Sequence, residues 1–98
     1  MVQINWTFQS RTDLKAIAEF ISKDSKKYAR LQIWRIRQRS KILISQKRAG
    51  KIVPEIENQN VRELVEGNYR IIYKIVNEMR IDILTVHHSA RDLTLRKI

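Results

Sequence analysis

Apolar and polar side chains alternate over residues 2–6, which is the pattern of a short β-strand. The period then changes to three or four residues, and a single apolar stripe of an α-helix follows. The residues of this stripe are Leu14, Ile17, Ala18 and Ile21. Because Ser10 precedes Asp13 by the spacing of a capping motif, we expect the first helix to begin near Ser10 and to end near Ser22.

A second, longer helix is predicted after Asp24 or Ser25, either of which can cap it. Its apolar residues fall on two roughly opposite sides. One side carries Ala29, Ile33, Ile36, Leu43 and Ile44, with Ser40 among them, and the other carries Leu31, Trp34 and Ile42. Two interpretations of the second side stay open. Leu31 and Trp34 pack against the first helix, or part of this stripe receives an amphipathic helix from another protein.

The last third of the chain returns to alternation and to β-branched residues. Strands are predicted at residues 61–65, 69–76 and 79–88, after a loop over 49–60 that contains Gly50 and Pro54. Short turns separate the three strands, so consecutive strands must be antiparallel neighbours. Ile71, Tyr73 and Ile75 lie on one face of the middle strand, and Arg70, Ile72 and Lys74 lie on the other.

These elements predict a two-layer α+β fold. An N-terminal strand is followed by a helical hairpin, which packs on a mainly antiparallel sheet with three consecutive C-terminal strands. The first strand is expected to join the same sheet. A chain of 98 residues has room for one domain, so residues 1–98 are treated as a single unit.

The charge of the chain is unevenly distributed. The net charge is +10, and residues 23–51 contain eleven basic residues and one acidic residue. Clustered positive charge attracts nucleic acids and acidic proteins, so we expect an acidic partner rather than a merely solvated helix face.

Several classes of site are disfavoured by the composition. The chain has no Cys, which excludes disulfides and thiolate metal sites. His87 and His88 point to opposite faces of a strand, which is poor geometry for one metal ion, and no glycine-rich phosphate loop occurs. We expect no metal, no cofactor and no small-molecule substrate. No apolar run approaches the ~18 residues of a membrane span, and no signal peptide is evident, so a cytoplasmic protein without membrane contact is expected.

Five stretches of the chain match a known family in order and spacing. They are residues 13–14, 50–55, 61–64, 69–73 and 86–92. Through these stretches the chain resembles the RelE/ParE superfamily, the toxins of bacterial type II toxin–antitoxin pairs. The resemblance implies a growth-inhibiting toxin and a cognate antitoxin that covers apolar helix surface and the arginine-bearing end of the sheet. We assign the antitoxin contact to Leu31, Trp34 and Ile42.

The resemblance leaves two targets, because RelE-like members cut messenger RNA in the ribosome and ParE-like members poison DNA gyrase. Metal-free RNA cleavage needs a base, a cation for the phosphate and a proton donor. By resemblance, Arg70 matches the phosphate-binding arginine, Arg62 an auxiliary arginine, and Glu55 a carboxylate of one nuclease subgroup. His88 is then the candidate proton donor. Simpler roles stay open: Arg70 pairs with a carboxylate of an adjacent strand, Glu63 or Asp82, Glu55 is a loop carboxylate, and the histidine is structural.

The C-terminal segment departs from the nuclease pattern. No Tyr follows Tyr73, and residues 86–92 look ParE-like, which favours gyrase inhibition over messenger RNA cleavage. A non-toxic basic module that binds nucleic acid is a third alternative. For target binding we expect cationic side chains from separate strands to gather at one rim of the sheet. The residues of this expected rim are Arg62, Arg70, His88, Arg91 and Lys51.

Overall fold

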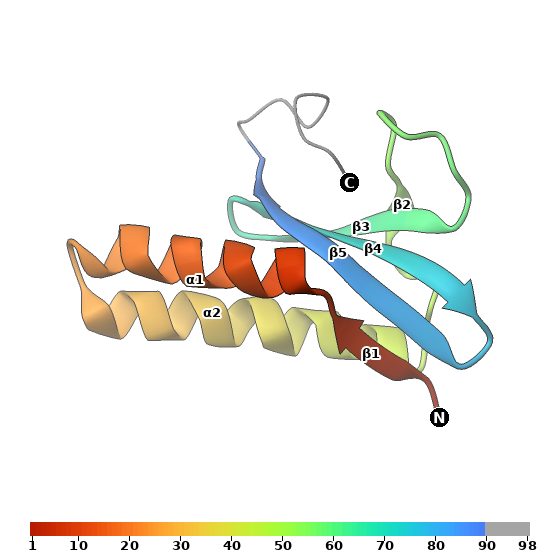
Figure 1. Cartoon of the computed structure of the whole chain (residues 1–98), viewed down its shortest axis with the longest axis horizontal. Helices are drawn as coiled ribbons and strands as arrows, with labels where there is room; N and C mark the ends of the chain where they lie inside the picture. Colours follow the sequence, from red (N-terminus) through yellow and green to blue (C-terminus); the bar gives the residue numbers. More distant parts are fainter. Residues whose placement is uncertain (90–98) are drawn as a thin grey trace.

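A computed structural model of the chain describes residues 1–89. The elements are β1 (Gln3–Trp6), α1 (Phe8–Ser22), α2 (Lys26–Ser40), the 3-10 turn η1 (Lys41–Ile44), β2 (Lys51–Ile52), β3 (Val61–Glu66), β4 (Tyr69–Asn77) and β5 (Arg80–His88). The five strands form one sheet in the order β1-β5-β4-β3-β2, in which only β1 and β5 are parallel. The helices form a hairpin that extends beyond one end of the sheet (Figure 1). The predicted α+β fold class is confirmed.

Helix α1 starts earlier than its sequence indicated. Thr7 caps it, because the Thr7 hydroxyl accepts a hydrogen bond of 3.2 Å from the Ser10 backbone N–H. Ser10 lies inside the first turn and is buried, and its hydroxyl donates to the Thr7 carbonyl at 2.8 Å. The expected start near Ser10 is therefore wrong by one turn, whereas the predicted end near Ser22 is confirmed.

Helix α2 is capped by Ser25, whose hydroxyl accepts from the Tyr28 backbone N–H at 3.0 Å. The helix tightens into η1 after Ser40, and the change of period rotates the following side chains. Ile42 packs against the core and Ile44 is 39% exposed, so neither lies on the side where the helical period places it.

The main core lies between the helical hairpin and one face of the sheet, which we call the inner face. Ile71, Tyr73 and Ile75 of β4 all point into it, as predicted. Its buried members also include Leu14, Ile36, Leu43, Leu64, Ile81, Ile83 and Val86. Burial of this apolar surface is what holds the two layers together.

The opposite, outer face of the sheet carries a second, smaller cluster. Val53, Val61 and Ile72 are buried there, and Ile56 and Leu84 pack against them. Val53 and Ile56 belong to the loop between β2 and β3, so this loop folds over the outer face. β2 itself lies inside the segment predicted as a loop; it is two residues long, which is too short for alternation to reveal.

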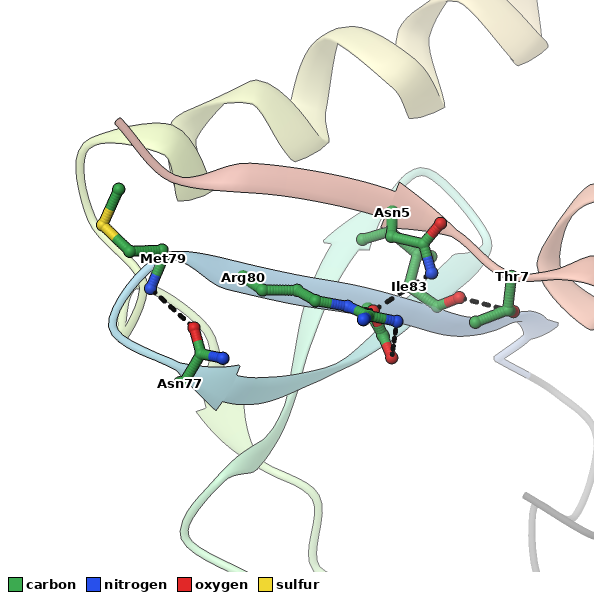
Figure 2. Close-up of polar contacts among 7 residues, drawn as sticks. Asn5, Thr7, Asn77, Met79, Arg80 and Ile83 are labelled. Carbon is green, nitrogen blue, oxygen red and sulfur yellow. Dashed lines mark hydrogen bonds and ion pairs between the residues drawn. The ribbon is translucent and has the colours of Figure 1, made fainter.

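The parallel pair β1–β5 joins the two ends of the described chain. The Gln3 backbone N–H donates to the Met79 carbonyl at 2.8 Å, and the Asn5 amide donates to Asp82 at 3.1 Å. Figure 2 shows Asn5 and Thr7 reaching across to β5, where the Thr7 hydroxyl donates to the Ile83 carbonyl at 2.7 Å. In the described part of the chain, no helix is long and apolar enough to cross a lipid bilayer.

Candidate functional site

Arg70 of β4 lies on the outer face between two carboxylates. Its Nε donates to Glu63 Oε2 at 2.7 Å, and its Nη2 also contacts that oxygen. Its Nη1 and Nη2 donate to the two oxygens of Glu55 at 2.8 and 2.9 Å. The guanidinium therefore makes a bidentate pair with a loop carboxylate and a second pair with a carboxylate of β3. We call Arg70, Glu55 and Glu63 the ionic cluster.

Arg70 and Glu63 are largely screened from solvent, whereas Glu55 is more exposed. The side chains of Arg70, Glu63 and Glu55 are 12%, 10% and 26% exposed. The hydrogen bonds from Arg70 lower the pKa of Glu55 from 4.5 to about 2, and the charge of His87 adds a smaller lowering. The carboxylates raise the pKa of Arg70, mainly through the hydrogen bond to Glu55. Glu55 and Arg70 are thus charged at neutral pH. The anion-binding edges of the guanidinium are occupied by the two carboxylates.

Arg62 lies on the other face of the sheet, opposite Tyr73. Its Nη1 donates to the Gly50 carbonyl and its Nε to the Gln59 carbonyl, each at 3.0 Å. The buried Tyr73 hydroxyl accepts from the Gly50 N–H at 3.0 Å and donates to the Lys47 carbonyl at 2.8 Å. Burial raises the pKa of Tyr73, so this hydroxyl stays a donor. Arg62 therefore binds the backbone just before β2 and just before β3.

Arg62 and Arg70 do not share a rim, contrary to expectation. Arg62 pairs with Tyr73, whereas Arg70 pairs with Val65, and odd and even positions of a strand point to opposite faces. Lys51 is exposed at the start of β2. Arg91 lies outside the described residues. The predicted gathering of cationic side chains is wrong for its two central arginines.

The two histidines also lie on opposite faces. His87 is opposite Arg70 on the outer face and is buried, with 2% exposure. His88 is opposite Tyr69 and packs edge-on against its ring, with centroids 5.4 Å apart. The candidate proton donor His88 and the candidate phosphate ligand Arg70 are thus separated by the sheet. The neighbour of Arg70 is His87, which was not chosen from the sequence; knowledge of the β4–β5 register would have identified it.

The helical hairpin carries an open groove on its surface, with a volume of about 540 Å³. Its apolar lining is Ala18, Ala29, Ile33 and Trp34, and its charged rim is Glu19, Lys26 and Arg30. Trp34 is 58% exposed. Leu31 is 37% exposed but does not line the groove, and Ile42 belongs to the core. Of the three residues assigned to the antitoxin, Trp34 alone lies at this groove.

A known protein family and a solved structure are similar to this chain. The family model for the ParE toxin of the type II toxin–antitoxin system parDE matches residues 4–93. The chain belongs to the ParE toxin family. A solved structure of the chromosomal ParDE system from P. aeruginosa is similar, with a TM-score of 0.72 and 22% identity, covering 90% of this chain and 96% of that chain. This likeness concerns the fold. No curated protein matches the sequence.

This ParE-family chain has a buried carboxylate, Asp13, which accepts hydrogen bonds from β5. Asp13 of α1 accepts from the Val86 backbone N–H at 3.0 Å and from the Thr85 hydroxyl. The Gln9 amide donates to its other oxygen at 2.8 Å. β1 ends at Trp6 and leaves the next part of β5 without a partner strand. There Asp13 serves as the hydrogen-bond acceptor for the backbone N–H of β5. In this ParE-family chain its role is to join α1 to the sheet.

Proposed function

We propose that this ParE-family toxin arrests growth by inhibiting DNA gyrase, and that it does not cut messenger RNA. The observation that carries the proposal is that the guanidinium of Arg70 is already paired with two carboxylates. Its hydrogen-bonding edges are filled by Glu55 and Glu63, which leaves no edge for a bidentate phosphate contact. A phosphate would also be repelled by the two carboxylates.

The position of the candidate proton donor His88 also supports this proposal. His88 lies on the face of the sheet opposite to Arg70. His87 lies on the same face as Arg70 but is buried against it. A nuclease must hold its cation and its acid on either side of one scissile phosphate. The described residues of this chain do not offer that arrangement.

The gyrase proposal is tested with the purified full-length chain in a supercoiling assay. We expect inhibition by the wild-type chain and a weaker effect after removal of residues 91–98. Arg70→Lys keeps the positive charge but loses the bidentate geometry, and it should inhibit gyrase as the wild type does, provided that circular dichroism shows a folded protein.

The alternative activities have their own readouts. If the wild type cuts messenger RNA on translating ribosomes and Arg70→Lys does not, the nuclease function replaces gyrase inhibition as the proposed function. Absence of growth arrest on induction without a partner gene would remove both toxin functions and favour a non-toxic nucleic-acid-binding module.

For the antitoxin, we propose that an amphipathic helix with acidic residues docks in the groove of the hairpin. The small residues Ala18 and Ala29 allow close approach, Trp34 offers a large exposed anchor, and Lys26 and Arg30 complement acidic side chains. Trp34→Ala should weaken antitoxin binding by about tenfold or more. Leu31→Ala, on the same helix but outside the groove, is the matched control and should change it by less than about threefold; equal losses would contradict docking in the groove.

A further inference from the structure

The outward surface of α2 is strongly basic, and the packing of the fold does not require this charge. The helix contains six basic residues and no acidic residue, whereas α1, of the same length, contains two of each. Lys27, Arg30 and Arg35 are exposed and form no hydrogen bond or ion pair within residues 1–89. Like charges four residues apart destabilise a helix, and α2 has such pairs at Lys26–Arg30 and Arg35–Arg39.

The exposed residues of α2 form a regular ridge. Lys27, Leu31, Trp34 and Gln38 follow one another at intervals of three or four residues and are all exposed. At 1.5 Å per residue, this ridge is about 16 Å long. Its residues belong to the side of the helix that faces away from the core, because the buried residues of α2 are Ala29, Gln32, Ile36 and Ser40.

Arginines flank the ridge on both sides. At about 100° per residue, Arg30 and Arg37 fall on one side, and Arg35 and Arg39 on the other. Arg37 stacks on Trp6, with Cζ 4.9 Å from the ring centroid, and Arg39 Nε donates to the Val65 carbonyl at 3.3 Å. The two flanks therefore reach outward mainly through Arg30 and Arg35.

We propose that this surface of α2 binds duplex DNA, with the ridge in the major groove and the flanking arginines on the two phosphate backbones. A helix with its side chains is about 10–12 Å wide and the major groove of B-DNA is about 12 Å wide, so the shapes match. The hairpin extends beyond one end of the sheet, so the N-terminal part of α2 lies away from the strands (Figure 1). Duplex RNA fits less well, because its major groove is deep and narrow.

This surface is distinct from the antitoxin groove, although Trp34 and Arg30 belong to both. The groove lies between α1 and α2, whereas Leu31, Arg35 and Gln38 lie away from it. DNA binding by the chain does not depend on the proposed action on gyrase. A chain that does not bind DNA could still inhibit gyrase in the supercoiling assay. A chain that does not inhibit gyrase could still bind DNA.

The test compares two triple variants of the full-length chain that lose the same charge. The first is Lys27→Gln/Arg30→Gln/Arg35→Gln on the proposed surface. The matched control is Arg11→Gln/Lys15→Gln/Arg48→Gln, whose side chains are exposed elsewhere. Binding to a labelled DNA duplex of about two helical turns is followed by fluorescence anisotropy between about 50 and 200 mM salt. Circular dichroism checks that both variants keep their helices.

We expect the first variant to bind at least about tenfold more weakly and the control to change by less than about threefold. Each lost phosphate contact should also reduce the slope of log affinity against log salt by about 0.9. Equal losses in the two variants would show that net charge alone is responsible and would overturn the proposal. Binding of duplex RNA as tightly as duplex DNA, or no binding by the wild type, would overturn it as well.

Discussion

On the inner face of the sheet, Ile71, Tyr73 and Ile83 are fully buried among apolar side chains, whereas on the outer face Arg70 lies between Glu55 and Glu63. Both arrangements use β4, in which Arg70 and Ile71 are adjacent in sequence and point to opposite faces. The inner face is stabilised by burial of area, which tolerates small shifts of many side chains. The ionic cluster depends on the geometry of three side chains at once, so removal of Arg70 leaves Glu63 buried without its cationic partner.

The largest effect is expected on the inner face. Ile71→Ala removes a side chain with no exposed surface and leaves a cavity. The free energy of unfolding should fall by about 4 kcal/mol. Urea unfolding measures this loss. Ile52→Ala, at a position that is 40% exposed, is the control and should cost less than about 1 kcal/mol.

A smaller loss is expected when the ionic cluster is broken. Arg70→Met should lower the free energy of unfolding by about 3 kcal/mol, because Glu63 is left buried without its cation. Adding Glu63→Gln should restore part of the loss, since the isolated charge is then removed. If the double variant is as unstable as the sum of the two single variants, Arg70 and Glu63 do not act as a unit.

The inner face also contains a buried polar contact of the Tyr73 hydroxyl, and its loss should cost less than the loss of Ile71. Tyr73→Phe removes the hydroxyl that bonds to Gly50 and Lys47 and leaves the buried Gly50 N–H without its acceptor. We expect a loss of about 1–2 kcal/mol in urea unfolding, with no change in the circular dichroism spectrum. A loss as large as that of Ile71→Ala would mean that the hydroxyl positions the whole connection between η1 and β2.

The smallest effect depends on pH and belongs to Glu55. Its pKa is lowered from 4.5 to about 2, so the stability that it contributes is present above pH 4.5 and is lost as the pH falls toward 2. Glu55→Gln should therefore be less stable than the wild type at pH 6, and the difference should shrink as the pH falls through this window. Glu78→Gln, which removes the exposed partner of Lys47, serves as the control and should show no such trend. A difference that stays constant with pH would contradict the role of the carboxylate charge.

The sequence correctly predicted the features that depend on the spacing of apolar residues along the chain. The two faces of β4, the helical hairpin and the joining of the first strand to the sheet all follow from where apolar residues recur. Arg70 was correctly considered as a possible partner of Glu63. The choice of Thr7 rather than Ser10 as the cap was not predictable, because both are good capping residues and packing against β5 decides between them.

The errors in the candidate site have a common cause. Whether Arg62 and Arg70 meet depends on the register of β3 with β4, and whether Arg70 meets His87 or His88 depends on the register of β4 with β5. The bond from Glu55 to Arg70 crosses a loop, where no period applies. Ile42 moved from the helix surface to the core because the last turn tightened to a 3-10 helix.

The parallel pairing of β1 with β5 brings together residues far apart in the chain, since Thr7 and Ile83 are 76 positions apart. During synthesis, β1 leaves the ribosome before β5 and has no partner strand until β5 has followed it. A strand with an unfilled edge is prone to pair with other chains, and such distant pairing is slow to form. The sheet therefore cannot be completed before β5 has been synthesised.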